Sequence, residues 1–86
     1  MEEKEIFNEI IRIIEEFVKD NSLLKTARPE TNIIKDLKVN SARLVDIIIK
    51  AEDAFDIEID DDDADSIKTI GDAVRVVIRK TSEVEA

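Results

Sequence analysis

Few side chains in this sequence can do chemistry, because it contains no cysteine and no histidine. That composition excludes cysteine nucleophiles, histidine general bases and the usual zinc sites, and it leaves carboxylates, lysines and hydroxyl groups. Ser41 follows Asn40, a good helix N-cap, where an amphipathic stretch running to Phe55 begins. A first-turn serine projects its hydroxyl to solvent beside unpaired backbone N–H groups, which can stabilise an attached phosphodiester. Ser41 is therefore either a modified residue or simply part of a helix start.

A second candidate is the acidic run of Asp60–Asp63 and Asp65, since hard cations prefer carboxylate oxygens. A calcium-binding EF-hand loop that began at Asp56 would need a glycine at its sixth position and a glutamate at its twelfth. Asp61 and Ile67 occupy those positions, so the motif fails. Acidic residues are also favoured at helix starts by the helix dipole. The run therefore indicates a short helix with weak, unspecific cation binding at most, and we predict no metal ligand.

Charge is distributed unevenly along the 86 residues, whose net charge is −9. Residues 41–66 hold ten acidic and two basic residues and so supply nearly all of the negative excess. Such a field repels nucleic acid and steers partners that present basic surfaces, although a solvated acidic face is the simpler alternative. No apolar run is long enough to span a bilayer, and the N-terminus lacks a secretory pattern. We expect a cytoplasmic monomer that does not insert into membranes.

The hydrophobic pattern predicts an all-α, four-helix bundle in a single domain over residues 1–80. Thr69 and Asp72 have the spacing of a capping box at the start of the last helix. Residues 81–86 are expected to form a frayed tail. The expected elements are a first helix over residues 3–19, a long ordered loop over 20–39, a second helix over 40–55, a short third helix after residue 60, and a fourth helix after residue 69.

The stretch from Asn40 to Ile59 resembles the signature helix of acyl carrier proteins and the approach to their third helix. In that family an Asp-Ser-Leu motif opens the second helix, and Asn40-Ser41-Ala42 occupies its place here. The family's Phe-Asp-x-Glu-Ile pattern is matched by the residues from Phe55 to Ile59, and its Ile-x-Thr-hydrophobic pattern by Ile67 to Ile70. The resemblance covers nearly the whole chain.

The resemblance implies a carrier and not an enzyme. A phosphopantetheinyl transferase would move 4′-phosphopantetheine from coenzyme A onto Ser41, and the thiol of this arm would hold an acyl group as a thioester. Fatty-acid, polyketide, peptide-synthetase and lipid-modification pathways all remain open for the cargo. The alternative function is an unmodified acidic helical adaptor that binds a basic protein partner.

Four positions depart from the family pattern. Asn40, Ala42 and Arg43 stand where Asp, Leu and often an acidic residue are usual, and Lys38 stands where Gly is often found. These changes make the start of the second helix less acidic than in most relatives. They imply a specialised carrier with dedicated partners.

Two further sets of residues are expected to act around Ser41. Acyl-transferring or synthase enzymes with basic surfaces are expected to dock on the second helix through Arg43, Asp46, Ile49, Asp53 and Asp56. An acyl pocket is expected where the small side chains of the second and third helices leave space, although neighbouring apolar side chains could close it. The predicted pocket residues are Ala51, Phe55, Ile59, Ala64 and Ile67.

Overall fold

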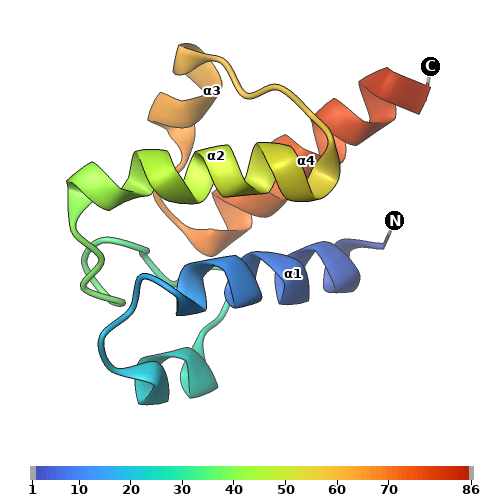
Figure 1. The fold of residues 1–86 in the computed structure, drawn as a ribbon. Coiled ribbons are helices and arrows are strands. Elements are labelled where there is room, and N and C mark those ends of the chain that lie inside the picture. The colour runs from blue at the N-terminus through green and yellow to red at the C-terminus, as the bar shows by residue number, and fades with distance from the viewer. Residues whose placement is uncertain (1, 86) are drawn as a thin grey trace.

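A computed structural model describes residues 2–85, and helices dominate this part of the chain (Figure 1). In Figure 1, α1 and α2 run side by side in opposite directions, α4 lies behind them and the short α3 crosses above. The all-α bundle with a long first connection and a short third helix is therefore confirmed. The helices are α1 (Glu3–Glu15), α2 (Leu44–Phe55), α3 (Asp61–Ser66) and α4 (Ile70–Glu85), with 3-10 helices η1 (Asn21–Thr26) and η2 (Ser41–Arg43).

The first helix ends earlier than the apolar pattern predicts, at Glu15 and not at residue 19. Its last turn tightens, because the N–H of Phe17 donates to Ile14 O at 2.8 Å, three residues back. Val18 is nevertheless buried, since the chain leaves the helix while still lying against the core. A buried Val18 at this spacing fits both a helix that continues to residue 19 and a chain that leaves the helix but stays against the core, so the sequence pattern does not locate the helix end.

The last helix continues to Glu85, beyond residue 80 where the sequence placed the end of the domain. The frayed tail over residues 81–86 stays a prediction, and Ala86 lies outside the described residues.

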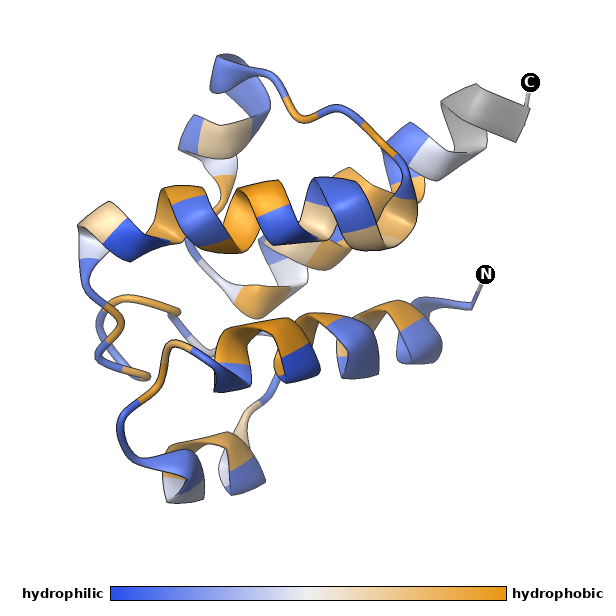
Figure 2. Cartoon of the chain, viewed as in Figure 1, coloured by the Kyte–Doolittle hydropathy of each residue, from blue (hydrophilic) through white to orange (hydrophobic). Residues whose placement is uncertain are grey.

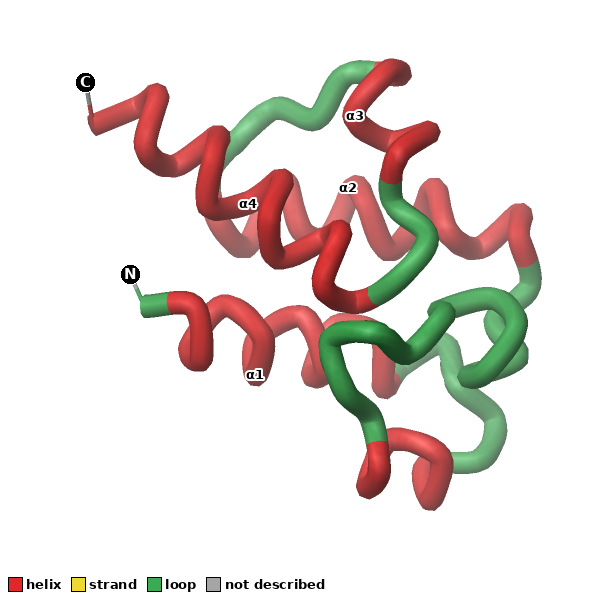
Figure 3. The backbone as a smooth tube through the Cα atoms, turned by 180° about the vertical axis from the view of Figure 1, so that it is seen from behind, coloured by secondary structure: helices red, strands yellow, loops and turns green. Residues whose placement is uncertain are grey.

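The long connection is ordered because it is tied to the start of α4. The backbone N–H of Ile33 donates to Lys68 O and that of Ile70 donates to Thr31 O, each at 3.0 Å. Figure 3 shows the loop wrapping the end of the bundle opposite the two chain termini. Ile33 and Leu37 of this loop are buried and anchor it to the core. The end of the bundle that carries Ser41 is therefore held in place.

Gly71 allows the loop and α4 to approach closely. Its N–H donates to Pro29 O at 2.7 Å. A Cβ at this position would lie 2.9 Å from that same backbone oxygen. Any other residue would therefore push the loop away from α4.

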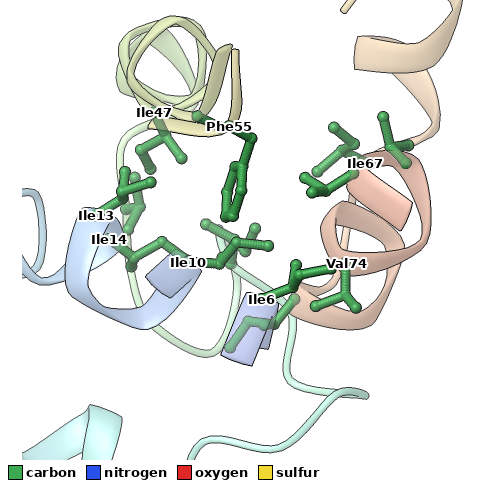
Figure 4. Packing of buried hydrophobic residues seen from close by; sticks show 14 of the residues in the cluster. Ile6, Ile10, Ile13, Ile14, Ile47, Phe55, Ile67 and Val74 are labelled. Atoms are coloured by element: carbon green, nitrogen blue, oxygen red, sulfur yellow. The ribbon is translucent and has the colours of Figure 1, made fainter. Parts of the chain in front are cut away.

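The core lies between α1, α2 and α4, which supply most of its buried side chains, and Figure 2 shows the apolar side of α1 turned toward α2. Ile6, Ile14 and Ile70 are fully buried. Figure 4 shows Phe55 projecting from α2 toward Ile10 of α1. With no disulfide in the sequence, the fold depends on this apolar packing.

The predicted capping box at the start of α4 is confirmed. The N–H of Asp72 donates to Thr69 Oγ1, and the N–H of Thr69 donates to Asp72 Oδ2, both at 3.1 Å. Burial disfavours the charged form of Asp72, but hydrogen bonds from Thr69, Lys68 and Arg75 outweigh that cost and lower its pKa.

Stability should depend on the ionisation of Asp72. Because its folded-state pKa is lowered, the carboxylate stabilises the fold above about pH 4, and this contribution is lost as pH falls through the folded pKa. We expect Asp72→Asn to lower the free energy of unfolding by about 1 kcal/mol at neutral pH. The deficit relative to the unchanged protein should shrink in acid. Urea unfolding across the pH range measures this, with exposed Asp65→Asn as control, and a deficit independent of pH would contradict it.

Candidate attachment and docking site

Ser41 lies in the first turn of the helical segment that leads into α2. Asn40 caps this turn as predicted, since its Oδ1 accepts a hydrogen bond from the N–H of Ala42 at 2.9 Å. The turn is a 3-10 turn, and the N–H of Arg43 donates to Asn40 O at 2.8 Å. Ser41 is exposed, and its hydroxyl makes no hydrogen bond to any side chain or backbone group that the structure describes. An enzyme can therefore reach this oxygen without unfolding the chain.

Charge and exposure around Ser41, more than free backbone donors, suit a phosphodiester. The N–H groups of Ala42, Arg43 and Leu44 are already used, because the first two donate to Asn40 and the third donates to Ser41 O. Arg43, two residues on, is exposed and cationic. No charge need be buried to attach an anionic group here, because the whole turn from Asn40 to Arg43 is exposed.

The loop before Ser41 is fixed by buried side chains and contains a strained residue. Leu37 and Val39 are each 2% exposed, and Lys38 between them has a φ of 57°. This left-handed conformation favours glycine, which explains why the related family often has Gly at this position. The side chain of Lys38 is exposed, so packing does not offset the strain.

Replacing Lys38 should therefore stabilise the protein. We expect Lys38→Gly to raise the free energy of unfolding by about 0.5–1 kcal/mol, because relief of backbone strain exceeds the added entropy of the unfolded chain. Lys38→Ala is the matched control, since it removes the same charge but keeps the strain. Equal urea midpoints for the two variants would show that the conformation costs nothing.

The solvent face of α2 combines exposed apolar and acidic side chains. Val45 and Ile49 are 59% and 53% exposed, one helical turn apart. Asp53 is exposed on the later part of the same helix and Asp56 is exposed at its C-cap, while Asp46 is half-buried and lies 3.1 Å from Arg43. Three of the five predicted docking residues thus lie on α2, and the other two, Arg43 and Asp56, flank it at its two ends. Arg43 already offsets the charge of Asp46. The sequence analysis missed Val45, although its spacing of four residues from Ile49 was a usable signal.

The flank of α2 that faces α1 is held by a lysine. Lys50 Nζ lies 2.6 Å from Glu16 Oε2 and 5.9 Å from the centroid of the Phe17 ring. Two basic residues near this face are therefore engaged by acidic neighbours, Arg43 just before α2 by Asp46, and Lys50 of α2 by Glu16 at the end of α1. The negative charge of α2 therefore lies mainly in its later half.

A small apolar cavity of about 20 Å³ lies inside the bundle. Three predicted pocket residues, Ala51, Ile59 and Ile67, line it, whereas Phe55 and Ala64 do not. The other walls come from Ile10, Ile13, Ile33, Leu44, Ile47, Ile48, Ala73 and Val77. The space holds little more than one water molecule, so an acyl chain needs a wall to move before it can enter.

Two carboxylates, neither of them predicted to have this role, hold the segment that borders this cavity. Glu52 Oε2 accepts a hydrogen bond from the N–H of Ile59 at 2.8 Å. Asp63 of α3 pairs with Arg79 and, at 3.1 Å, with Lys80 of α4. The hydrogen bond from Lys80 lowers the pKa of Asp63. The acidic run thus includes one residue with a defined structural partner on α4.

The remaining acidic residues form no metal site in the described part of the chain. No group of three or more acidic side chains in residues 2–85 is arranged to hold a metal ion. Asp60 instead caps α3, where its Oδ1 accepts from the N–H of Asp63 at 2.8 Å. Over the same residues, no helix is long and apolar enough to cross a membrane.

Comparison with known proteins adds family information to this geometry. A family model described as a phosphopantetheine attachment site matches residues 7–77. The chain is 42% identical over 78 residues to the acyl carrier protein of Lactobacillus acidophilus, which covers 90% of this chain and 94% of that protein. It is 37% identical over 78 residues to the acyl carrier protein of Picosynechococcus sp., covering 91% and 94%. Among solved structures, the acyl carrier protein from Enterococcus faecalis is similar with a TM-score of 0.76 at 28% identity, covering 93% of this chain and 99% of that one.

Proposed function

We propose that this chain, which belongs to the acyl carrier protein family and bears a covalent 4′-phosphopantetheine arm, carries that arm on the Oγ atom of Ser41. The observation that supports this most directly is the exposed, unbonded hydroxyl of Ser41 in the capped turn before α2. Ser22 and Ser66 are poorer candidates because their hydroxyls already donate to Asp20 and to Asp63.

Modification requires little of the chain beyond presentation of Ser41. Ser41 Oγ forms the new bond to phosphorus, its proton passes to a base of the phosphopantetheinyl transferase, and the remainder of coenzyme A leaves. The Asn40 cap holds the turn that orients the hydroxyl, and the buried neighbours Leu37 and Val39 hold the loop before it. The arm supplies the thiol that this cysteine-free chain lacks, so acyl groups can be held as thioesters.

Partner enzymes dock, in this proposal, on the solvent face of α2. Val45 and Ile49 supply apolar contact area, and Asp53 with Asp56 attracts basic side chains. Transferases and synthases are the partners that the family implies, and we assign the carrier to acyl transfer in lipid metabolism such as fatty acid biosynthesis. We further propose that the chain acts as a cytoplasmic monomer and performs no catalysis itself.

The carrier function is tested by the intact mass of the purified chain after incubation with coenzyme A and a broad-specificity transferase. We expect a mass gain of one 4′-phosphopantetheine group, mapped by peptide fragmentation to Ser41. Absence of any gain would favour the alternative, an unmodified adaptor. Modification mapped to another serine would overturn the assignment to Ser41 while leaving the carrier function.

A further inference from the structure

One wall of the small cavity belongs to a segment with few buried side chains. α1 and α4 pack through fully buried side chains such as Ile6, Ile14 and Ile70. In contrast, α3 contains no buried residue, and Ala64 is only partly buried. Cavity-lining residues flank α3 on both sides, the partly buried Ile59 before it and the buried Ile67 after it, so the helix between them is the least anchored part of this wall. The segment from Ile59 to Ile67 is therefore the wall that can move at the lowest cost.

Polar contacts hold that wall at two places. The hydrogen bond from the N–H of Ile59 to Glu52 ties its start to α2. The pairing of Asp63 with Arg79 and Lys80 ties its middle to α4, and the side chain of Asp63 is only 13% exposed. A partly desolvated ion pair is screened less by solvent than an exposed one, so this tie resists opening.

We infer that Glu52 and Asp63 set how much of an acyl chain the carrier shelters, because their contacts determine how readily the wall from Ile59 to Ile67 opens. The inference rests on the proposed function, in which the cargo is carried on Ser41. A chain can enter only the opened form, so its apparent affinity for the interior is reduced by the fraction of molecules that are open. Weakening either tie should therefore increase shelter for long chains. Short chains, which do not reach the interior, should be unaffected.

The first experiment uses the unloaded protein and needs no arm. Amide hydrogen exchange over residues 59–67 should become about tenfold faster in Asp63→Asn and in Glu52→Ala. Asp61→Asn, which changes an exposed carboxylate of the same helix, should leave these rates unchanged. Glu52→Gln keeps an oxygen acceptor and should recover much of the protection. Exchange in α1 provides the internal reference for global unfolding.

The second experiment uses the chain loaded with butanoyl or dodecanoyl thioester. We expect Asp63→Asn to slow hydrolysis of the dodecanoyl thioester about threefold relative to the unchanged protein, with butanoyl hydrolysis unaltered. Asp61→Asn should match the unchanged protein for both chains. Equal or faster dodecanoyl hydrolysis in Asp63→Asn would overturn the inference.

The two experiments separate this inference from the proposed function. If no thioester can be formed because Ser41 accepts no arm, the carrier function fails, and hydrogen exchange alone decides whether the two carboxylates hold the wall. Exchange over residues 59–67 that is equally fast in Asp61→Asn and Asp63→Asn would overturn the inference even if loading succeeds.

Discussion

Ser41→Ala should abolish the mass gain that follows incubation with coenzyme A and transferase, while the helical circular-dichroism signal stays intact. The loss is expected to be complete because no other residue supplies the oxygen that bonds to phosphorus. The fold should be nearly unchanged, since the Ser41 hydroxyl is exposed and makes no hydrogen bond within residues 2–85. We expect a change of less than about 0.5 kcal/mol in the free energy of unfolding.

Two further variants distinguish the role of the Ser41 hydroxyl from the role of the helix cap that orients it. Ser22→Ala removes another exposed hydroxyl and should leave the mass gain unchanged. Asn40→Ala keeps Ser41 but removes the cap on Ala42, which should cost about 1 kcal/mol and slow modification without abolishing it. Continued modification of Ser41→Ala would refute the assignment.

The cap residues around this site could be predicted from sequence because capping depends on local spacing. Asn40 precedes Ala42 by two residues, and Thr69 precedes Asp72 by three, so each contact forms within one turn. The centre of the buried face of α2 does not follow from local spacing in the same way. Ile47 is buried while Leu44 and Ile48 are only partly buried, although all three are apolar residues of the same helix. The spacing of apolar residues predicts which side of a helix is buried, but which of these residues is buried most depends on how the neighbouring helices pack.

The ties over the cavity could not be predicted, because they join residues far apart in sequence. Asp61, Asp62 and Asp63 are chemically identical neighbours, and only the third lies against Arg79. Nothing in the sequence distinguishes Glu52 from the other acidic residues of α2, although it accepts a hydrogen bond from the N–H of Ile59. Their roles depend on where α3 and the linker pack, which no local pattern records. The small size of the cavity likewise depends on how these segments pack, so it could not be predicted from the sequence.

Association with a partner enzyme should be slowed strongly by Asp53→Lys. Asp53 is exposed and makes no ion pair within the described residues, so its charge is fully available to a basic partner. We expect the association rate with the transferase to fall about tenfold at low salt, and this effect should shrink as salt is added. Asp46→Lys is a poorer test, since it also breaks the contact with Arg43. Glu15→Lys on α1 makes the same charge change away from the docking face and serves as the control.

The apolar part of the docking face should affect the dissociation rate of the complex and not the association rate. Ile49→Ala removes exposed contact area without disturbing the core, so we expect dissociation to become about tenfold faster, with little change in the association rate. Stopped-flow or surface-binding kinetics can resolve the two rates in parallel for Asp53→Lys and Ile49→Ala. If both variants bind with unchanged kinetics at every salt concentration, then partners do not use this face of α2. Slower association in Glu15→Lys equal to that in Asp53→Lys would instead show that only the net charge of the chain matters.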